Sequence, residues 1–373
     1  MNPAAAAFPR PLATFLLLTV VLGAITAYAP APSFQTDRDV YEAIGRQHVI
    51  LDCSDLHCFR VLVAWMLDPF PGPSLLKWKS YAVLANAGAA VALGRLCITL
   101  GLSARTALLA TWLAGLGSGP LLTLFNCYTS DPLMFLMGPL VLNALIVGRR
   151  GHAGLIAGIG VFAKEFAAAP LWIFCIWSAM RRRWEVALRS LATATGVTLV
   201  WVGLQLWLML RYNYTYAGSA STDIVGGGDL AVWLGEVGYR GAAMAVFGEF
   251  GALWVVMPIG LLFAPRDLRL LAVAAAPAAL ALVVVQQPDR ALWNFHFIAI
   301  PLAVLVLRQL PDLLCGLFVL CYALANLRIG AQLTFVPAAR VPLSLSLLLA
   351  AAAVVLMVSR RARLPGTSVV TQT

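Results

Sequence analysis

The polar run Thr36-Asp37-Arg38-Asp39-Val40-Tyr41, which follows the first apolar segment, holds the residues best suited to chemistry. On a helix that begins near Asp37, this residue and Tyr41 share one face, whereas Asp39 points about 160° away. Asp37 and Tyr41 would then face one cavity, where a carboxylate can take the proton of a substrate hydroxyl. An aspartate at a helix start also binds exposed backbone N–H groups and favours the helix dipole. The run thus predicts either a general base or a helix cap.

A second pair of charged residues, Lys164 and Glu165, interrupts an apolar stretch. Ionisable groups within such segments are costly and usually mark a functional site. The lysine would hold a phosphate, and the glutamate would hold either the lysine or a substrate hydroxyl. The simpler interpretation is an ion pair in which the two residues neutralise each other.

Two further segments carry groups suited to an anionic or hydroxylated ligand. Segment 126–132 ends in a Ser-Asp-Pro pattern that is typical of a helix start, so Asp131 either caps the helix or helps to bind a ligand at its N-terminus. Segment 286–296 offers the guanidinium fork of Arg290 for phosphate and the imidazole of His296 for proton transfer. Arg290 can instead pair with its neighbouring aspartate.

The segment from His48 to Cys58 contains several potential metal ligands, but its spacing matches no closed zinc pattern. No metal site is therefore predicted there. Cys53 and Cys58 would form a local disulfide if this loop lies in an oxidising compartment. Arg60, two residues further on, adds a cation to the same acidic loop.

The elements that must position these groups are membrane helices. With 61% hydrophobic and 11% charged residues over 373 positions, the chain has the composition of an integral membrane protein. We expect an all-α, polytopic bundle of about ten spans that forms a single transmembrane domain over residues 1–373, with outer loops at 30–78 and 211–240. The apolar runs lie near 11–29, 79–101, 106–125, 132–148, 190–210, 241–263, 270–286, 292–307, 313–328 and 341–359. The first run ends in a sequence similar to a signal-peptidase site, so a cleaved signal is an alternative for it.

Arginine-rich turns predict the orientation, because short cytoplasmic loops are enriched in Lys and Arg. With both termini in the cytoplasm, most of these turns fall on the cytoplasmic side, and the net charge of +10 reflects topology and not nucleic-acid binding. The residues are Arg105, Arg149, Arg150, Arg181, Arg182, Arg183, Arg189, Arg266, Arg269, Arg308, Arg360 and Arg361.

Segment 153–180 does not fit this alternation, because arginine clusters flank it on both sides. It is long for one span and too short for two. We expect a re-entrant pair of half-helices that turns at Lys164-Glu165, with one long, tilted helix as the alternative.

Four short motifs at matching places give the chain a resemblance to a known family. They are Asp37-Arg38-Asp39-Val40-Tyr41, Tyr128-Thr129-Ser130-Asp131, Ala163-Lys164-Glu165-Phe166 and the segment from Asp289-Arg290 to Pro301. With them the chain resembles the bacterial GT-C superfamily of membrane glycosyltransferases, which use polyprenyl-phosphate sugars as donors. The Asp-x-x-Val-Tyr pattern is similar to that of the mannosyltransferases that use polyprenyl-phosphomannose.

The resemblance implies a GT-C-like fold and roles for individual residues. Asp37 would be the catalytic base, with Asp39 as the second choice. Arg290 and Lys164 would contact the donor phosphate, and His296 would lie near the acceptor or the donor linkage. The other residues expected at the substrate are Glu165, Tyr41, Arg60 and Asp131.

The implied reaction is a single inverting displacement that moves a sugar, such as mannose, to a lipid or glycan acceptor at the outer face of the bacterial inner membrane. This chemistry requires no cofactor, and a divalent metal ion is an option that the acidic loop leaves open. Membrane lipids would be the surrounding partners. The alternative function is a transporter or lipid flippase that uses Lys164 and Glu165 as a coupling pair.

Overall fold

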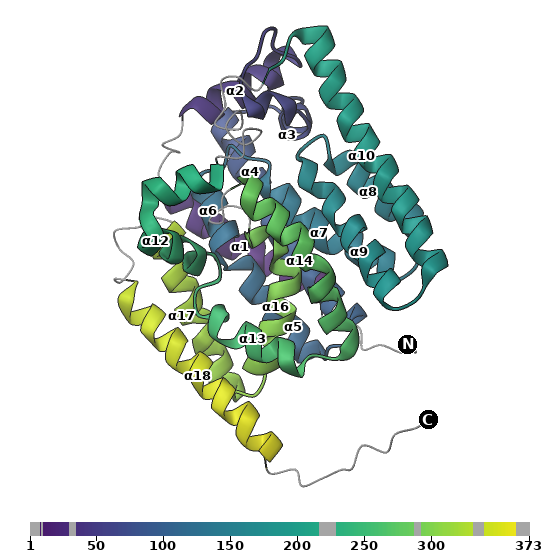
Figure 1. Cartoon of the computed structure of the whole chain (residues 1–373). Helices are drawn as coiled ribbons and strands as arrows, with labels where there is room; N and C mark the ends of the chain where they lie inside the picture. Colours follow the sequence, from purple (N-terminus) through teal and green to yellow (C-terminus); the bar gives the residue numbers. More distant parts are fainter. Residues whose placement is uncertain are drawn as a thin grey trace.

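The computed structural model describes Phe8 and residues 10–29, 35–215, 229–286, 292–330 and 339–362, and every regular element in these ranges is helical (Figure 1). The α-helices are α1 (Pro11–Tyr28), α2 (Gln35–Gln47), α3 (Leu62–Leu67), α4 (Ser74–Thr99), α5 (Ala104–Gly115), α6 (Ser118–Phe125), α7 (Asp131–Ile146), α8 (Arg150–Gly160), α9 (Ala169–Met180), α10 (Trp184–Tyr212), α12 (Asp229–Phe250), α13 (Leu253–Phe263), α14 (Arg266–Gln286), α16 (His296–Leu307), α17 (Asp312–Gly330) and α18 (Arg340–Ala362). Three short 3₁₀ helices are η1 (Leu56–Phe59), η2 (Glu165–Ala168) and η3 (Leu292–Phe295).

Several of these helices are long and apolar enough to cross a membrane. Five described helices meet this criterion, with α5 and α6 taken as one, and the number rises to six if the pair bent by 67° at the junction of α12 and α13 is one span. Apolar side chains are exposed on the outer helices, for example Leu16 on α1, Leu199 on α10 and Leu348 on α18, as expected for surfaces that face lipid. The chain is therefore a helical, multi-pass membrane protein. The figure of about ten spans stays a prediction.

Arginine-rich turns meet at one end of the bundle, the lower end in Figure 1. We call this region, which contains Arg105, Arg181, Arg308, Arg360 and Arg361, the arginine end. The contacts that join its turns are Arg105 with Asp312 at 2.6 Å, Arg360 with Gln309 at 2.9 Å, Arg181 with Asp267 at 3.2 Å, and Arg361 over the ring of Phe263 at 4.3 Å. The turns that the charge pattern assigns to one side thus lie together in space.

The stretch 153–180 is not one helix. α8 ends at Gly160, the backbone of Lys164 is extended (φ −169°, ψ 142°), and η2 begins at Glu165. Gly160 lets the two arms approach closely, because a methyl group on it would lie 2.7 Å from the Cβ of Ala167. The alternative of one long, tilted helix is therefore wrong.

The turn of this hairpin lies away from the arginine end. α8 packs on α10 where Gly154 meets Thr193, and the carbonyl of Phe162, after the end of α8, accepts a hydrogen bond of 3.1 Å from the backbone N–H of Leu62 at the other end of the bundle. α9 then returns to the arginine end, where Arg181 forms its ion pair. Both ends of the hairpin therefore lie on the same side of the bundle, as the flanking arginines predict.

The opposite end of the bundle is covered by α2, η1 and α3 (Figure 1). We call the region formed by α2, residues 48–61, the turn 126–130 and the turn 161–165 the loop end. Backbone hydrogen bonds of 3.0 Å from Asp52 to Tyr212 and of 2.9 Å from Thr215 to Cys53 connect the end of α10 to this region. The expected outer loop 211–240 thus begins against the loop 30–78, whereas residues 216–228 lie outside the described part of the chain.

Candidate active site

α2 turns one face toward the bundle and the other toward solvent. Tyr41 is only 1% exposed and Asp37 is half-buried, whereas Asp39 lies on the exposed face. Because successive residues on a helix are about 100° apart, residues 37 and 41 must share a face that residue 39 leaves. The structure thus agrees with the expected geometry of Asp37 and Tyr41 and puts Asp39 outside the candidate site.

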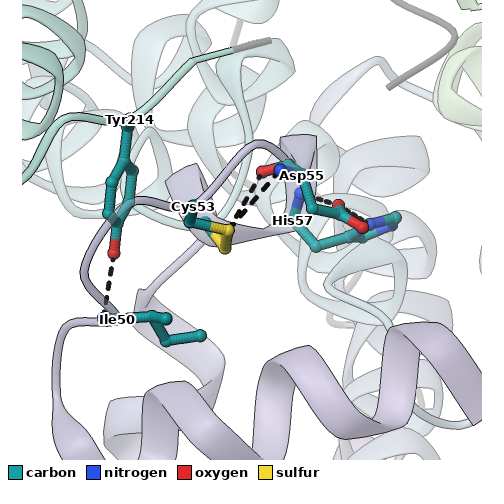
Figure 2. The surroundings of a disulfide bond; sticks show 6 residues. Ile50, Cys53, Asp55, His57 and Tyr214 are labelled. Atoms are coloured by element: carbon teal, nitrogen blue, oxygen red, sulfur yellow. Dashed lines mark hydrogen bonds and ion pairs between the residues drawn. A yellow bond between two sulfur atoms is a disulfide. The ribbon is translucent and has the colours of Figure 1, made fainter. Parts of the chain in front are cut away.

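Asp37 lies beside His57, which the sequence offered only as one of several potential metal ligands. Its Nε2 lies 3.9 Å from Oδ1 of Asp37, and its Nδ1 lies 2.7 Å from Oδ1 of Asp55. Asp55 also accepts the backbone N–H of His57 at 2.8 Å (Figure 2). These hydrogen bonds, the one to the His57 ring above all, lower the pKa of Asp55 below its ordinary value.

A disulfide bond between Cys53 and Cys58 closes the loop that carries Asp55 and His57 (Figure 2). The sequence predicted this bond on condition of an oxidising compartment. Figure 2 also shows the hydroxyl of Tyr214, which accepts the backbone N–H of Ile50 at 3.2 Å. The loop is therefore held both by a covalent bond and by the chain that follows α10.

Lys164 and Glu165 form no ion pair with each other in the described part of the chain, although their charges interact, so the simpler interpretation of a self-neutralised pair is wrong. Nζ of Lys164 bonds Oδ1 of Asp131 at 2.7 Å, and Arg60 pairs with Glu165 at 3.5 Å. The extended backbone at Lys164 explains this result, because neighbouring side chains on extended backbone point in opposite directions. One side chain reaches the start of α7, and the other reaches the acidic loop.

Tyr41 connects these groups. Its hydroxyl interacts electrostatically with Arg60, Asp131 and Asp37, and burial raises its pKa, so that it stays a neutral hydrogen-bond donor. Arg60 and Lys164 lie close enough for their charges to interact. The site therefore gathers two cations, several carboxylates and one buried phenol.

A second network fixes α2 to the rest of the bundle. Arg38 bonds Glu42 at 2.8 Å, the hydroxyl of Tyr128 donates to Glu42 at 3.2 Å, and the hydroxyls of Ser74 and Tyr128 are 3.3 Å apart. Burial would raise the pKa of Glu42, but the hydrogen bonds from these three residues outweigh it and lower the pKa. The network holds α2 against α4 and against the turn before α7, which keeps Asp37 and Tyr41 facing inward.

His296 lies apart from the charged cluster. It is fully buried, stacks on Trp293 at an interplanar angle of 9°, and contacts the ring of Phe135 with 5.9 Å between centroids. Phe135 is about one helical turn further along α7 than Asp131. His296 therefore belongs to an aromatic layer beneath the site, and Arg290, its expected companion at the donor phosphate, lies outside the described residues.

Trp293 anchors this layer in a slot formed by two glycines. A methyl group on Gly117 would lie 1.9 Å from its ring, and one on Gly119 would lie 2.1 Å from it. The backbone N–H of Trp293 donates to Oε2 of Glu249 at 3.2 Å. Glu249 is a buried carboxylate that no sequence motif indicates.

No three His, Cys, Asp or Glu side chains are grouped to hold a metal ion within the described ranges. A comparison with protein-family models and one with curated proteins found no match for this chain. The described loop end thus brings together Asp37, Tyr41, Arg60, Asp131, Lys164 and Glu165 from the expected site, and adds Asp55 and His57.

Proposed function

We propose that this chain is a GT-C-type membrane glycosyltransferase that transfers a sugar, with mannose as the first candidate, from a polyprenyl-phosphate donor to a lipid or glycan acceptor. The observation that carries the proposal is that the buried Tyr41 interacts with both the half-buried carboxylate of Asp37 and the guanidinium of Arg60, and that Arg60 in turn lies close to Lys164. A base beside two cations is what a sugar-phosphate donor and a hydroxyl acceptor require.

The two cations are suited to the donor phosphate. Each of them contacts a carboxylate, Lys164 at 2.7 Å and Arg60 at 3.5 Å, and their own charges lie close together. A phosphate between them would make charge-assisted hydrogen bonds to both. The longer contact of Arg60 is the weaker of the two, so we expect Arg60 to move to the phosphate more readily than Lys164.

In the reaction, Asp37 would take the proton of the acceptor hydroxyl while that oxygen attacks the anomeric carbon. The bond from this carbon to the phosphate oxygen breaks, and the phosphate leaves with the electron pair, stabilised by Arg60 and Lys164. The neutral phenol of Tyr41 would donate a hydrogen bond beside these groups. One displacement of this kind inverts the anomeric configuration.

The membrane location belongs to the same proposal. We place the loop end on the outer face of the bacterial inner membrane and the arginine end with both termini in the cytoplasm, because basic residues favour the cytoplasmic side. A disulfide in the loop end supports this orientation, since such bonds persist in oxidising compartments.

The test is transfer of radiolabelled sugar from polyprenyl-phosphomannose to a membrane lipid extract by the purified protein. We expect product from the wild type, a loss of about 10²- to 10⁴-fold from Asp37→Asn, and a rate near that of the wild type from Asp39→Asn, which makes the same change on the exposed face. If Asp39→Asn is the variant that loses activity, the base is Asp39.

If none of the three proteins forms product with a panel of lipid-linked sugars and added divalent metal, the proposal is overturned. This result would favour a transporter or flippase instead, for which the buried Lys164–Asp131 pair, and not Lys164–Glu165, would be the candidate coupling pair.

A further inference from the structure

We infer that Asp55 and His57 form a pair that accepts the proton from Asp37 after each transfer and so returns Asp37 to its ionised form. This inference rests on the proposed function, because it assigns the step that follows proton uptake by Asp37. His57 acts through Asp37 and is therefore a positioning residue, whereas Asp37 is the catalytic residue.

The hydrogen bonds of Asp55 determine which ring nitrogen of His57 is available. Oδ1 of Asp55 lies 2.7 Å from Nδ1 and also accepts the backbone N–H of His57 at 2.8 Å. A carboxylate at Nδ1 keeps the proton on that nitrogen, so Nε2 carries the lone pair. Nε2 is the atom that faces Oδ1 of Asp37 at 3.9 Å.

The distance of 3.9 Å is longer than a direct hydrogen bond, which measures about 2.7–3.2 Å. Contacts of catalytic groups are often long before the substrate binds and shorten in the substrate complex, or one water molecule bridges them. His57 is 20% exposed, so water can reach the ring.

The position of the imidazole is well defined by its surroundings. The Cys53–Cys58 bond spans both members of the pair, and the ring of Tyr41 meets the ring of His57 edge-on with 5.5 Å between centroids. The charged groups around the pair are Asp37 from α2 and Arg60 from the residue after η1, which interacts with both Asp55 and Tyr41.

The proton would follow one path. It leaves the acceptor hydroxyl for Asp37 as the new bond to the anomeric carbon forms and the bond to the phosphate oxygen breaks. Asp37 then passes it to Nε2 of His57, and the resulting imidazolium, which lies between two carboxylates, releases it to water. Asp55 keeps its hydrogen bond throughout and stabilises the cation.

The experiment measures steady-state transfer by His57→Ala, His57→Gln, Asp55→Asn and, as the matched control, His152→Ala, which changes an exposed histidine at the arginine end. We expect the first three variants to lower kcat about 10-fold or more with little change in the KM for the donor, because they touch the proton step and not the phosphate site. The control should behave as the wild type.

Added imidazole should restore at least part of the rate of His57→Ala, which a merely structural role would not explain. His57→Gln, in the Asp37→Asn background, should cause no further loss, because residues that act as one unit are not additive. A wild-type kcat for both His57 variants, or a loss that imidazole leaves unchanged while Asp55→Asn is fully active, would overturn the pair and leave the glycosyltransferase intact. An inactive wild type would instead overturn the proposed function, and the pair with it.

Discussion

The loop end and the arginine end both contain ion pairs, but they hold their charges in different surroundings. At the arginine end the Arg105 side chain is 49% exposed and that of its partner Asp312 is 89% exposed, whereas at the loop end the Lys164 side chain is 6% exposed and that of its partner Asp131 is 21% exposed. Exposed pairs contribute little to stability and cost little to form. The burial of Lys164 removes most of its hydration, so its attraction to Asp131 must offset a desolvation cost.

The partners of the charges differ as well. Arg105 donates to the backbone carbonyl of Leu310 at 2.8 Å, beyond the end of α16, where a cation satisfies exposed carbonyls and favours the helix dipole. At the loop end, cations and carboxylates from four separate segments meet one another instead. Charge content alone therefore does not identify a site. A candidate site differs from arginines that only reflect membrane topology in two ways: its charges are buried, and they come together from separate segments.

The two ends should face opposite sides of the membrane, and single cysteines test this with an all-or-none result. In sealed vesicles, a membrane-impermeant thiol reagent should label His152→Cys and Arg182→Cys from the same side and Asp39→Cys from the other side. The first two positions flank the hairpin, and Asp39 is exposed at the loop end. Labelling of positions 152 and 182 from opposite sides would refute the hairpin. The unsubstituted protein measures the background from the native cysteines.

A matched pair of substitutions tests the difference in burial. Asp131→Asn leaves the buried ammonium of Lys164 without its carboxylate and should lower the free energy of unfolding by about 3 kcal/mol or more. Asp312→Asn makes the same chemical change at the arginine end and should cost less than about 1 kcal/mol. Thermal or denaturant unfolding in one detergent measures both. Equal losses would mean that the two ends do not differ in the way described.

Part of this arrangement follows from the sequence. The predicted apolar runs fall on helices, the arginine flanks predict the hairpin, and the helical period puts Asp37 and Tyr41 on one face. Breaks inside two runs were not anticipated, at Gly117 between α5 and α6 and at Gly251 between α12 and α13, where φ is +50°. Gly251 can adopt this angle without the strain that other residues would suffer.

The partners within the site could not be predicted in the same way. Lys164 meets Asp131 across 33 positions and Arg60 meets Glu165 across 105, so both pairs depend on how the hairpin packs against α7 and the loop. Sequence neighbours suggested Lys164 with Glu165 instead. The role suggested for His57 also depends on packing, because its ring reaches Asp37 only after the loop folds back on α2.

The aromatic layer beneath the loop end depends on close packing and not on charge. Gly119→Ala would push a methyl group into the ring of Trp293 and should cost about 1–3 kcal/mol of stability through overpacking. Gly158→Ala is the control, because nothing lies within 4 Å of the added group and the helix should gain about 0.5–1 kcal/mol. Thermal unfolding of both variants measures the difference. A neutral Gly119→Ala would show that Trp293 moves freely.

The smallest expected effect is a change in melting temperature at acid pH. The hydrogen bonds from His57 lower the pKa of Asp55 below its ordinary 3.8, so this contact stabilises the folded state above that pH and is lost as the pH falls through the lower folded-state value. We expect wild type to exceed Asp55→Asn in melting temperature near pH 5, and the gap to close as the pH falls below 3.8 and through the lower folded-state pKa. A gap that is constant over this range would show that ionisation of Asp55 does not stabilise the loop.

α10 has a mechanical consequence for the site. It is one unbroken helix of 29 residues, roughly 43 Å long, and so exceeds the roughly 30 Å of bilayer hydrocarbon. A helix of this length tilts or projects from the membrane by an amount that depends on the thickness of the bilayer. The backbone carbonyl of Tyr212 at its end accepts a hydrogen bond from the backbone N–H of Asp52. Any such tilt would therefore be transmitted to the disulfide-closed loop that holds Asp55 and His57. We therefore expect the acyl-chain length of the surrounding lipids to influence the geometry around Asp37.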